Sequence, residues 1–158
     1  MTNVNPIPDG YHTATPYLYI RGAADAIAFY KKAFGAVETM PPMTGPDGKI
    51  AHAEIKIGDS TLMLSDEDAE MGTKSPQALG GSPISIMLYL PDCDAATRQA
   101  VAAGATVVME PSDQFYGDRA STVDDPFGFQ WHIHTHIEDV APDEMERRMS
   151  AMAAGAPA

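Results

Sequence analysis

Cysteine, basic residues and long apolar runs are all scarce in this chain of 158 residues. Its single cysteine, Cys93, cannot form an internal disulfide, which excludes a small secreted domain held together by disulfides. No stretch reaches the roughly 18 apolar residues that a membrane-spanning helix requires. The first residues carry neither the basic region nor the apolar run of a secretory signal peptide. We therefore expect a cytoplasmic protein.

The shortage of basic residues narrows the range of partners. Lys and Arg number 10 and Asp and Glu number 22, so the formal net charge is −12. Nucleic-acid-binding proteins need clustered basic side chains to displace counterions, and no such cluster is present. An anionic membrane surface would repel the chain. A small molecule and a second copy of the chain, as a homodimer, are the partners we expect.

An internal repeat organises the sequence. Residues 17–20 have the pattern of a strand, and they lead into a helical stretch at 23–34 that stops at Gly35. Residues 87–90 lead in the same way into a second helical stretch at 92–103 that stops at Gly104. Glycine suits the left-handed position that follows many helices. The repeat predicts two modules that share one architecture.

Further strands follow each helix. The first half predicts strands at 37–40, 50–57 and 60–64, and the second half at 106–109, 120–123 and 129–137, with a loop around Pro111. Each half is therefore a βαβββ module, in an α+β fold. We expect a single domain over 1–137, with module 1 at about 11–65, a linker at 66–83 and module 2 at about 84–137. Pro142 starts a C-terminal helical tail within 138–158.

Strand alternation sorts side chains onto two faces. Along the last strand Trp131, Ile133 and Ile137 share one face, and His132, His134 and His136 share the other. Helices bury their apolar stripes against the apolar sheet faces. The opposite, polar faces have two interpretations. They line a cavity with aromatic walls and a few polar groups, or they are plain solvent-exposed surfaces.

Four stretches together resemble a known family. They are AIAFYKKAFG at 26–35, HAEIKIGD at 52–59, DQFYGDR at 113–119 and DPFG at 125–128. The chain resembles the glyoxalase/bleomycin-resistance/extradiol-dioxygenase (vicinal oxygen chelate) superfamily, and in particular its PhnB-like branch, from about Gly10 to His136. The resemblance implies an open, barrel-like mixed sheet around a cavity, with the helices outside, usually in a homodimer.

The resemblance also implies positions for a metal site. Metal-dependent members take one ligand from the first and one from the last strand of each module, and these positions fall on Thr15, Glu54, Ser85 and His132. Only Glu54 and His132 are good ligands for a divalent ion such as Zn, Ni, Mn or Fe. The neutral hydroxyls of the other two are poor ligands. A metal would therefore need a further ligand, and His12, His52 and His134 are the candidates.

A second group of side chains suggests a pocket wall. The guanidinium of Arg119 suits an anionic ligand group, and the nearby ring of Tyr116 suits an apolar or planar one. Alternatively, Arg119 forms an Arg–Asp pair that stabilises its loop. The predicted ligand pocket comprises Thr15, Tyr17, Glu54, Ser85, Tyr116, Arg119 and His132.

Three functions remain open from the sequence. The first is a protein that binds a small molecule in the cavity of the concave sheet. The second is a metal-dependent enzyme of the lyase, isomerase or dioxygenase type, in which an ion near Glu54 and His132 polarises substrate oxygens. The third is a non-catalytic dimeric interaction protein, whose methionine-rich tail (Met145, Met149, Met152) packs on a partner or on its own core.

Overall fold

The computed structural model describes residues 4–153 and 155 and forms two compact units. Unit 1 comprises Met1–Pro83 and Pro126–Phe129, and unit 2 comprises Ile84–Asp125 and Gln130–Ala158. The predicted linker at 66–83 therefore belongs to unit 1. Each unit combines helices with a sheet in which most strand pairs are antiparallel, which confirms the predicted α+β class.

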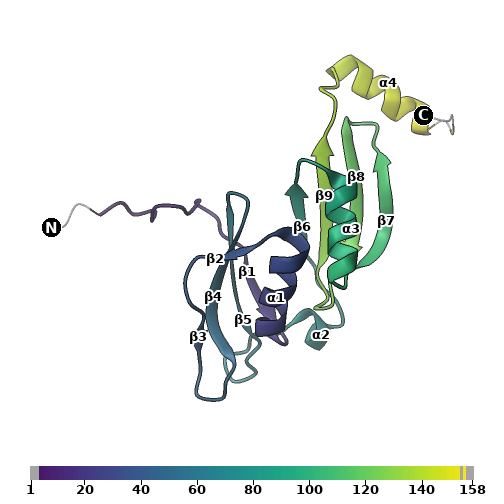
Figure 1. Ribbon diagram of the computed structural model, residues 1–158. Coiled ribbons are helices and arrows are strands. Elements are labelled where there is room, and N and C mark those ends of the chain that lie inside the picture. The colour runs from purple at the N-terminus through teal and green to yellow at the C-terminus, as the bar shows by residue number, and fades with distance from the viewer. Residues whose placement is uncertain (1–3, 154, 156–158) are drawn as a thin grey trace. The chain divides into compact units, whose positions relative to one another are not determined.

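Unit 1 contains one sheet and two helices. Its elements are β1 (Tyr17–Ile20), α1 (Ala23–Phe34), β2 (Val37–Glu38), β3 (Met43–Thr44), β4 (Ile50–Ile57), β5 (Ser60–Asp66) and α2 (Pro76–Leu79). The strand order is β1-β5-β4-β2, and β3 also pairs with β4. Strand β1 runs parallel to β5, whereas the other pairs are antiparallel. Helix α1 packs against β1, β4 and β5 on one face of this sheet (Figure 1).

Local sequence explains where α1 begins and ends. The carboxylate of Asp66 accepts hydrogen bonds from the backbone N–H groups of Gly22 (2.9 Å) and Ala23 (3.0 Å), which would otherwise be unsatisfied. The helix ends at Gly35, whose φ of 66° lies in the left-handed region that favours glycine. The apolar stripe of α1 is buried together with Leu18 and Ile55 of the sheet. Sequence pattern, capping and packing therefore agree along this helix.

Unit 2 repeats this topology. Its elements are β6 (Ser85–Tyr89), α3 (Cys93–Ala103), β7 (Thr106–Asp113), β8 (Asp118–Asp124), β9 (Gln130–His136) and α4 (Pro142–Ala153). The strand order β6-β9-β8-β7 again places the first strand parallel to the last. Helix α4 follows β9 and lies beyond the end of the sheet rather than on either face (Figure 1). The predicted pair of βαβββ modules is confirmed.

Helix α3 covers one face of the unit 2 sheet. Asp92 caps the helix, because its side chain accepts a hydrogen bond of 2.9 Å from the backbone N–H of Ala95. The buried thiol of Cys93 donates to the carbonyl oxygen of Ile133 (3.2 Å), so this cysteine has a packing role. Trp131 is fully buried on the same side and donates from Nε1 to Asp125 (2.9 Å).

Three details of the sequence interpretation are wrong. Strand β7 continues through Pro111 to Asp113, since an edge strand with register irregularities tolerates a residue that lacks an N–H group. The short strand β3 lies where no strand was predicted, and the short helix α2 lies within the predicted linker. Ile137 lies after β9 and is 51% exposed, so it does not share the buried face of Trp131.

Each sheet thus has one face covered by a helix and one opposite face. We call the face opposite α1 the polar face of unit 1, and the face opposite α3 the polar face of unit 2. Strand register places Tyr17, Tyr19, His52, Glu54 and Met63 on the first, and Met87, Tyr89, Asp118, Thr122, His132, His134 and His136 on the second. No helix among the described residues is both long and apolar enough to cross a bilayer.

Candidate functional site

A buried carboxylate lies at the centre of the polar face of unit 1. Glu54 on β4 is only 7% exposed. It accepts hydrogen bonds from the hydroxyl of Tyr11, from Thr39 Oγ1 (3.3 Å) and from His52 Nε2 (3.2 Å). Because a carboxylate can only accept, His52 must carry its proton on Nε2. Its Nδ1 then accepts from the hydroxyl of Tyr17 at 3.1 Å.

These contacts keep Glu54 ionised. The hydrogen bond from Tyr11 lowers the pKa of the Glu54 carboxyl more than burial raises it, and the bonds from His52 and Thr39 lower it further. The same hydrogen bond to Glu54 raises the pKa of Tyr11. The result is a fixed negative charge connected through His52 to Tyr17.

Exposed aromatic rings lie next to His52, which binds this carboxylate. The rings of Tyr17 and Tyr19 lie 5.2 Å apart on β1, and the ring of Tyr17 lies 5.8 Å from His52. Both tyrosines line a pocket of about 750 Å³ in unit 1, together with Lys49, Ala51 and Asp68. Unit 1 therefore offers apolar ring surface beside a buried anion.

The polar face of unit 2 has its own buried carboxylate. Asp118 on β8 is 4% exposed and accepts hydrogen bonds from Tyr89 (3.0 Å), His134 Nδ1 (3.0 Å) and His136 Nδ1 (2.8 Å). Burial raises the pKa of Asp118, but these three donors outweigh it and the pKa is lowered. The rings of Tyr89 and Tyr116 both contact His134, at centroid distances of 5.5 and 6.2 Å.

His132 occupies the same face without belonging to this cluster. Its Nδ1 lies 3.0 Å from Thr122 Oγ1 on the neighbouring strand. Met87 lies beside it in register on β6 and is 53% exposed. Ser85 is exposed at the start of β6, again on this face.

The predicted pocket residues fall in unit 1, on the polar face of unit 2 and, for Arg119, on the α3 side of the unit 2 sheet. In unit 1, Tyr17 and Glu54 share the polar face, and half-buried Thr15 precedes β1. In unit 2, Ser85 and His132 lie on the polar face, and Tyr116 stacks on His134.

Arg119 lies on the opposite, α3 side of the unit 2 sheet. Its guanidinium binds Asp94 on α3 and Asp113 on β7. These contacts match the alternative in which Arg119 forms an Arg–Asp pair, although neither partner is the adjacent Asp118. Two carboxylates neutralise the guanidinium, so Arg119 is not among the groups that the polar face offers to a ligand.

The family of the chain follows from comparison with known proteins. The sequence model of the Glyoxalase/Bleomycin resistance protein/Dioxygenase superfamily matches residues 11–133. The chain belongs to this superfamily. An uncharacterised Mycobacterium tuberculosis protein (strain H37Rv) is 44% identical over 144 residues, which cover 89% of this chain and 84% of that protein. Protein YjdN of Escherichia coli is 28% identical over 142 residues, covering 76% of this chain and 92% of YjdN.

Solved structures confirm the superfamily fold. An Arabidopsis thaliana gene product superposes with a TM-score of 0.61 at 26% identity, covering 78% of this chain and 98% of that one. TioX from a Micromonospora species superposes with a TM-score of 0.60 at 21% identity, over 82% and 100% of the two chains. A PhnB protein from Bacillus cereus superposes with a TM-score of 0.58 at 16% identity, covering 78% of this chain and 99% of that one.

The superfamily's metal positions do not map onto this chain as the sequence suggested. Glu54 lies on β4, which is followed by β5, so its assignment to the last strand of module 1 is wrong. On β5 the residue that matches His132 in register is Met63, because Tyr17 pairs with Met63 as Met87 pairs with His132. A methionine thioether is a poor ligand for a hard divalent ion.

The side chains in the described part of the chain do not fit a complete metal site. Among residues 4–153 and 155, no three His, Cys, Asp or Glu side chains are grouped to hold an ion. Glu54 is already occupied by three donors, and among the described residues the hydrogen bond of His132 goes to the hydroxyl of Thr122, which is a poor metal ligand. The divalent ion therefore stays a prediction that elemental analysis of the purified protein tests.

Sequence reasoning missed most of the residues that surround the two carboxylates. Asp118 was noted only in a motif, and Tyr11, Thr39 and Tyr89 had no assigned role. Strand alternation did place His134 on the correct face. It gave no partner for this histidine, because the partners come from other strands or from loops.

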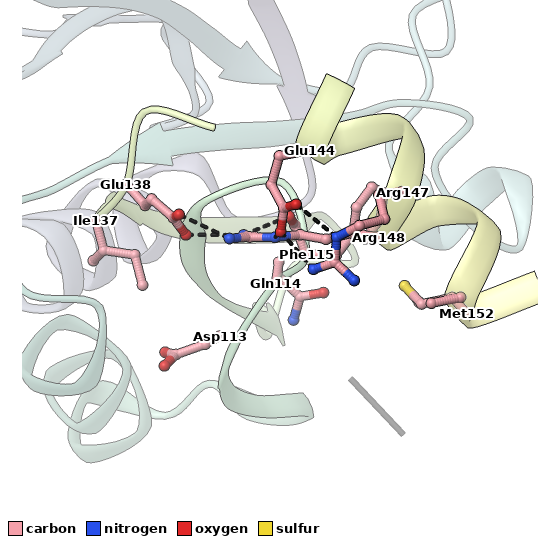
Figure 2. Close-up of a pocket in the computed structure, with 10 residues that line it drawn as sticks. Asp113, Gln114, Phe115, Ile137, Glu138, Glu144, Arg147, Arg148 and Met152 are labelled. Carbon is pink, nitrogen blue, oxygen red and sulfur yellow. Dashed lines mark hydrogen bonds and ion pairs between the residues drawn. The ribbon is translucent and has the colours of Figure 1, made fainter. Parts of the chain in front are cut away.

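A separate pocket of about 570 Å³ lies against α4 and is lined by residues of that helix and of the loops near it (Figure 2). Arg148 holds this region together. It binds both carboxylate oxygens of Glu138 (2.8 Å each), Glu144 (2.8 Å) and the carbonyl oxygen of Phe115 (3.1 Å). Arg147 and Arg148 together lower the pKa of Glu144 to about 2. These ion pairs anchor α4 to the rest of unit 2.

Replacing Arg148 with alanine should release α4. Arg147→Ala is the matched control, because among the described residues the hydrogen bonds of Arg147 go to Glu144, on its own helix. We expect amide hydrogen exchange over 142–153 to rise strongly in Arg148→Ala and weakly in Arg147→Ala, with β8 and β9 unchanged in both. Equal exchange in the two variants would show that Arg148 does not anchor the helix.

His136 should make stability depend on pH. Hydrogen bonds to Asp118 and then to Asp139 raise the pKa of His136 in the folded state. The stabilisation is therefore complete below the unfolded pKa of about 6.5 and is lost as the pH rises through the higher folded pKa. The stability difference between wild type and His136→Gln, measured by urea unfolding, should be larger at pH 6 than at pH 9. A difference that does not change with pH would contradict this assignment.

Proposed function

We propose that this superfamily member binds a small organic molecule on the polar faces of its sheets. One observation carries the proposal. Both units hold a buried, ionised carboxylate on the face opposite the helix, Glu54 in unit 1 and Asp118 in unit 2. An exposed tyrosine is linked to each carboxylate, Tyr17 through His52 in unit 1 and Tyr89 directly in unit 2. Ligand sites in proteins combine a mostly apolar lining with a few fixed polar groups. Recurrence in two units argues against a chance arrangement.

The charges on these faces indicate the class of ligand. The carboxylates of Glu54 and Asp118 are negative, and Arg119 is neutralised on the other side of its sheet. The whole chain carries −12. A neutral or cationic ligand with apolar or planar parts therefore suits these faces better than the anionic one that Arg119 suggested.

Ligand-observed NMR with a mixture of neutral and cationic aromatic fragments tests this proposal. We expect fragments to bind the wild-type protein, and Tyr17→Ala and Tyr89→Ala each to weaken binding to its own unit. Val101→Ala is the control, since Val101 is also exposed but lies on α3. Binding that is weakened by Val101→Ala and unaffected by the two tyrosine variants would overturn the proposal.

A metal-dependent lyase, isomerase or dioxygenase is the second candidate. The superfamily name includes glyoxalases and dioxygenases, and Glu54 is an ionised carboxylate of the kind that divalent ions bind, although an ion would have to displace the donors that it already binds. Purified protein loaded with Zn, Ni, Mn or Fe should then retain about one ion per chain after dialysis. The loss of all added metal would reject this candidate.

The homodimer and a role as an interaction protein are also proposals. Exposed methionines on α4, Met149 and Met152, supply the apolar surface that supports them. Light scattering should give twice the chain mass for the wild type and a reduced mass for Met149→Glu/Met152→Glu. An unchanged mass would exclude α4 as the contact.

A further inference from the structure

One imidazole on the polar face of unit 2 is held in a defined protonation pattern. The side chain of His134 is about nine-tenths buried or more, at 6% exposure, and its Nδ1 lies 3.0 Å from Asp118 Oδ2. An ionised carboxylate can only accept a hydrogen bond, so the proton of the neutral imidazole lies on Nδ1. The other nitrogen, Nε2, is then a hydrogen-bond acceptor.

This acceptor is open rather than sealed in the core. The structure gives His134 one hydrogen bond, through Nδ1. Among the described residues, no buried side-chain nitrogen or oxygen lacks a hydrogen-bond partner. Nε2 of His134 is therefore not an orphaned, fully buried atom, and in a side chain that is 6% exposed it is a partly accessible acceptor on the polar face. A ligand that donates a hydrogen bond can approach it there.

Asp118 holds the imidazole as part of a larger network. Its Oδ1 accepts from His136 Nδ1, and Nε2 of His136 lies 3.0 Å from Asp139 Oδ1. Its Oδ2 accepts from Tyr89 as well as from His134. The carboxylate is thus bound from β6 and β9 at once, which fixes its position and, through it, the orientation of the His134 ring.

The surroundings of the acceptor favour a planar ligand. Tyr116 lies nearly parallel to the His134 ring, at 19°, and Tyr89 meets it edge-on, at 62°. Tyr89 remains 62% exposed although its hydroxyl is bound. Exposed Met87 lies two residues before Tyr89 on the same face of β6. Aromatic rings beside this acceptor, with a thioether further along the same face, fit a ring that carries a hydrogen-bond donor.

We propose that His134 Nε2 accepts a hydrogen bond from the ligand, that the ligand is a planar ring with a hydroxyl or N–H group, and that Asp118 is the positioning residue that fixes the imidazole tautomer. This inference rests on the proposed function and adds the chemical class of the ligand to it.

The tautomer is tested without any ligand. Long-range ¹H–¹⁵N NMR of the full chain above pH 8 should show His134 protonated on Nδ1. In Asp118→Asn the amide can donate to Nδ1, so the population should shift towards the Nε2–H form. Asp139→Asn is the matched control, because Asp139 contacts His136 and not His134, and it should leave the His134 tautomer unchanged. An Nε2–H tautomer in the wild type would overturn the inference.

The ligand class is tested with phenol and anisole as probes. They share one ring, but only phenol has a donor hydroxyl. We expect phenol to bind unit 2 about two- to tenfold more tightly than anisole and to shift the Nε2 resonance of His134, as one neutral hydrogen bond implies. The preference should disappear in Asp118→Asn and in His134→Phe and persist in Asp139→Asn. Equal binding of the two probes to the wild type would overturn this part.

The outcomes separate the inference from the proposed function. If aromatic fragments bind to the polar faces but phenol has no advantage, the inference fails and the proposed function stands. If no fragment binds either face, the proposed function fails, and so does the assigned ligand class. Should Asp118→Asn not fold, the wild-type tautomer and the phenol–anisole comparison decide the matter by themselves.

Discussion

Replacing Trp131 with alanine destabilises unit 2 by about 3–5 kcal/mol, the range expected for removing a fully buried large aromatic side chain. Trp131 lies on β9 on the side that α3 covers, so its loss leaves a cavity at the centre of the unit 2 core. It also removes the hydrogen bond from Nε1 to the buried carboxylate of Asp125. Urea unfolding followed by far-ultraviolet circular dichroism measures the loss.

His132→Ala is the matched control for this prediction. His132 is the next residue on β9, but its side chain lies on the polar face and has one hydrogen bond, to Thr122. We expect its loss to cost no more than about 1 kcal/mol. Similar losses for both variants would mean that the two faces of the unit 2 sheet are not assigned correctly.

Replacing Glu54 with glutamine weakens the binding of cationic or hydrogen-bond-donating fragments to unit 1 by about tenfold or more, since hydrogen bonds to charged groups are the stronger ones. Glutamine keeps the shape of the side chain and one acceptor oxygen. It removes the negative charge and turns an NH₂ group towards donors that now face no acceptor. Titration of the fragments that bind the wild type gives the ratio of dissociation constants.

Lys56→Gln controls for the general effect of changing a charge on this strand. Lys56 lies two residues after Glu54 on the same face of β4 and is more exposed. Its replacement should leave the affinity of cationic fragments unchanged or slightly improved. Wild-type affinity in Glu54→Gln would remove Glu54 from the binding site.

Local signals in the sequence were sufficient for much of the fold. Helix α1 has the predicted bounds, because its apolar stripe, its glycine stop and its packing all indicate the same segment. Strands β4 and β5 follow from alternation around a Gly-Asp turn. The predicted strand ended before Pro111 because proline lacks an N–H group, but β7 is an edge strand and needs fewer N–H donors. Helix α2 has four residues, too few for a periodic pattern.

The site was predicted less completely than the fold, for a physical reason. Strand parity depends only on neighbours in the chain, so it placed His132 and His134 on the polar face. The partner of His134 is Asp118, 16 positions earlier, and only strand register brings the two together. Counting from motifs alone also put Glu54 on the wrong strand, because it took no account of the hairpin that follows.

Methyl NMR of the methionines tests the central claim, that the polar faces bind small molecules, most directly. Met63 and Met87 lie on the polar faces, whereas Met149 and Met152 lie on α4, where Met152 lines the pocket of Figure 2. On addition of the bound fragments, we expect the methyl resonances of Met63 or Met87 to shift in proportion to occupancy, and those of Met149 and Met152 to stay in place. Shifts confined to the α4 methionines would contradict the account.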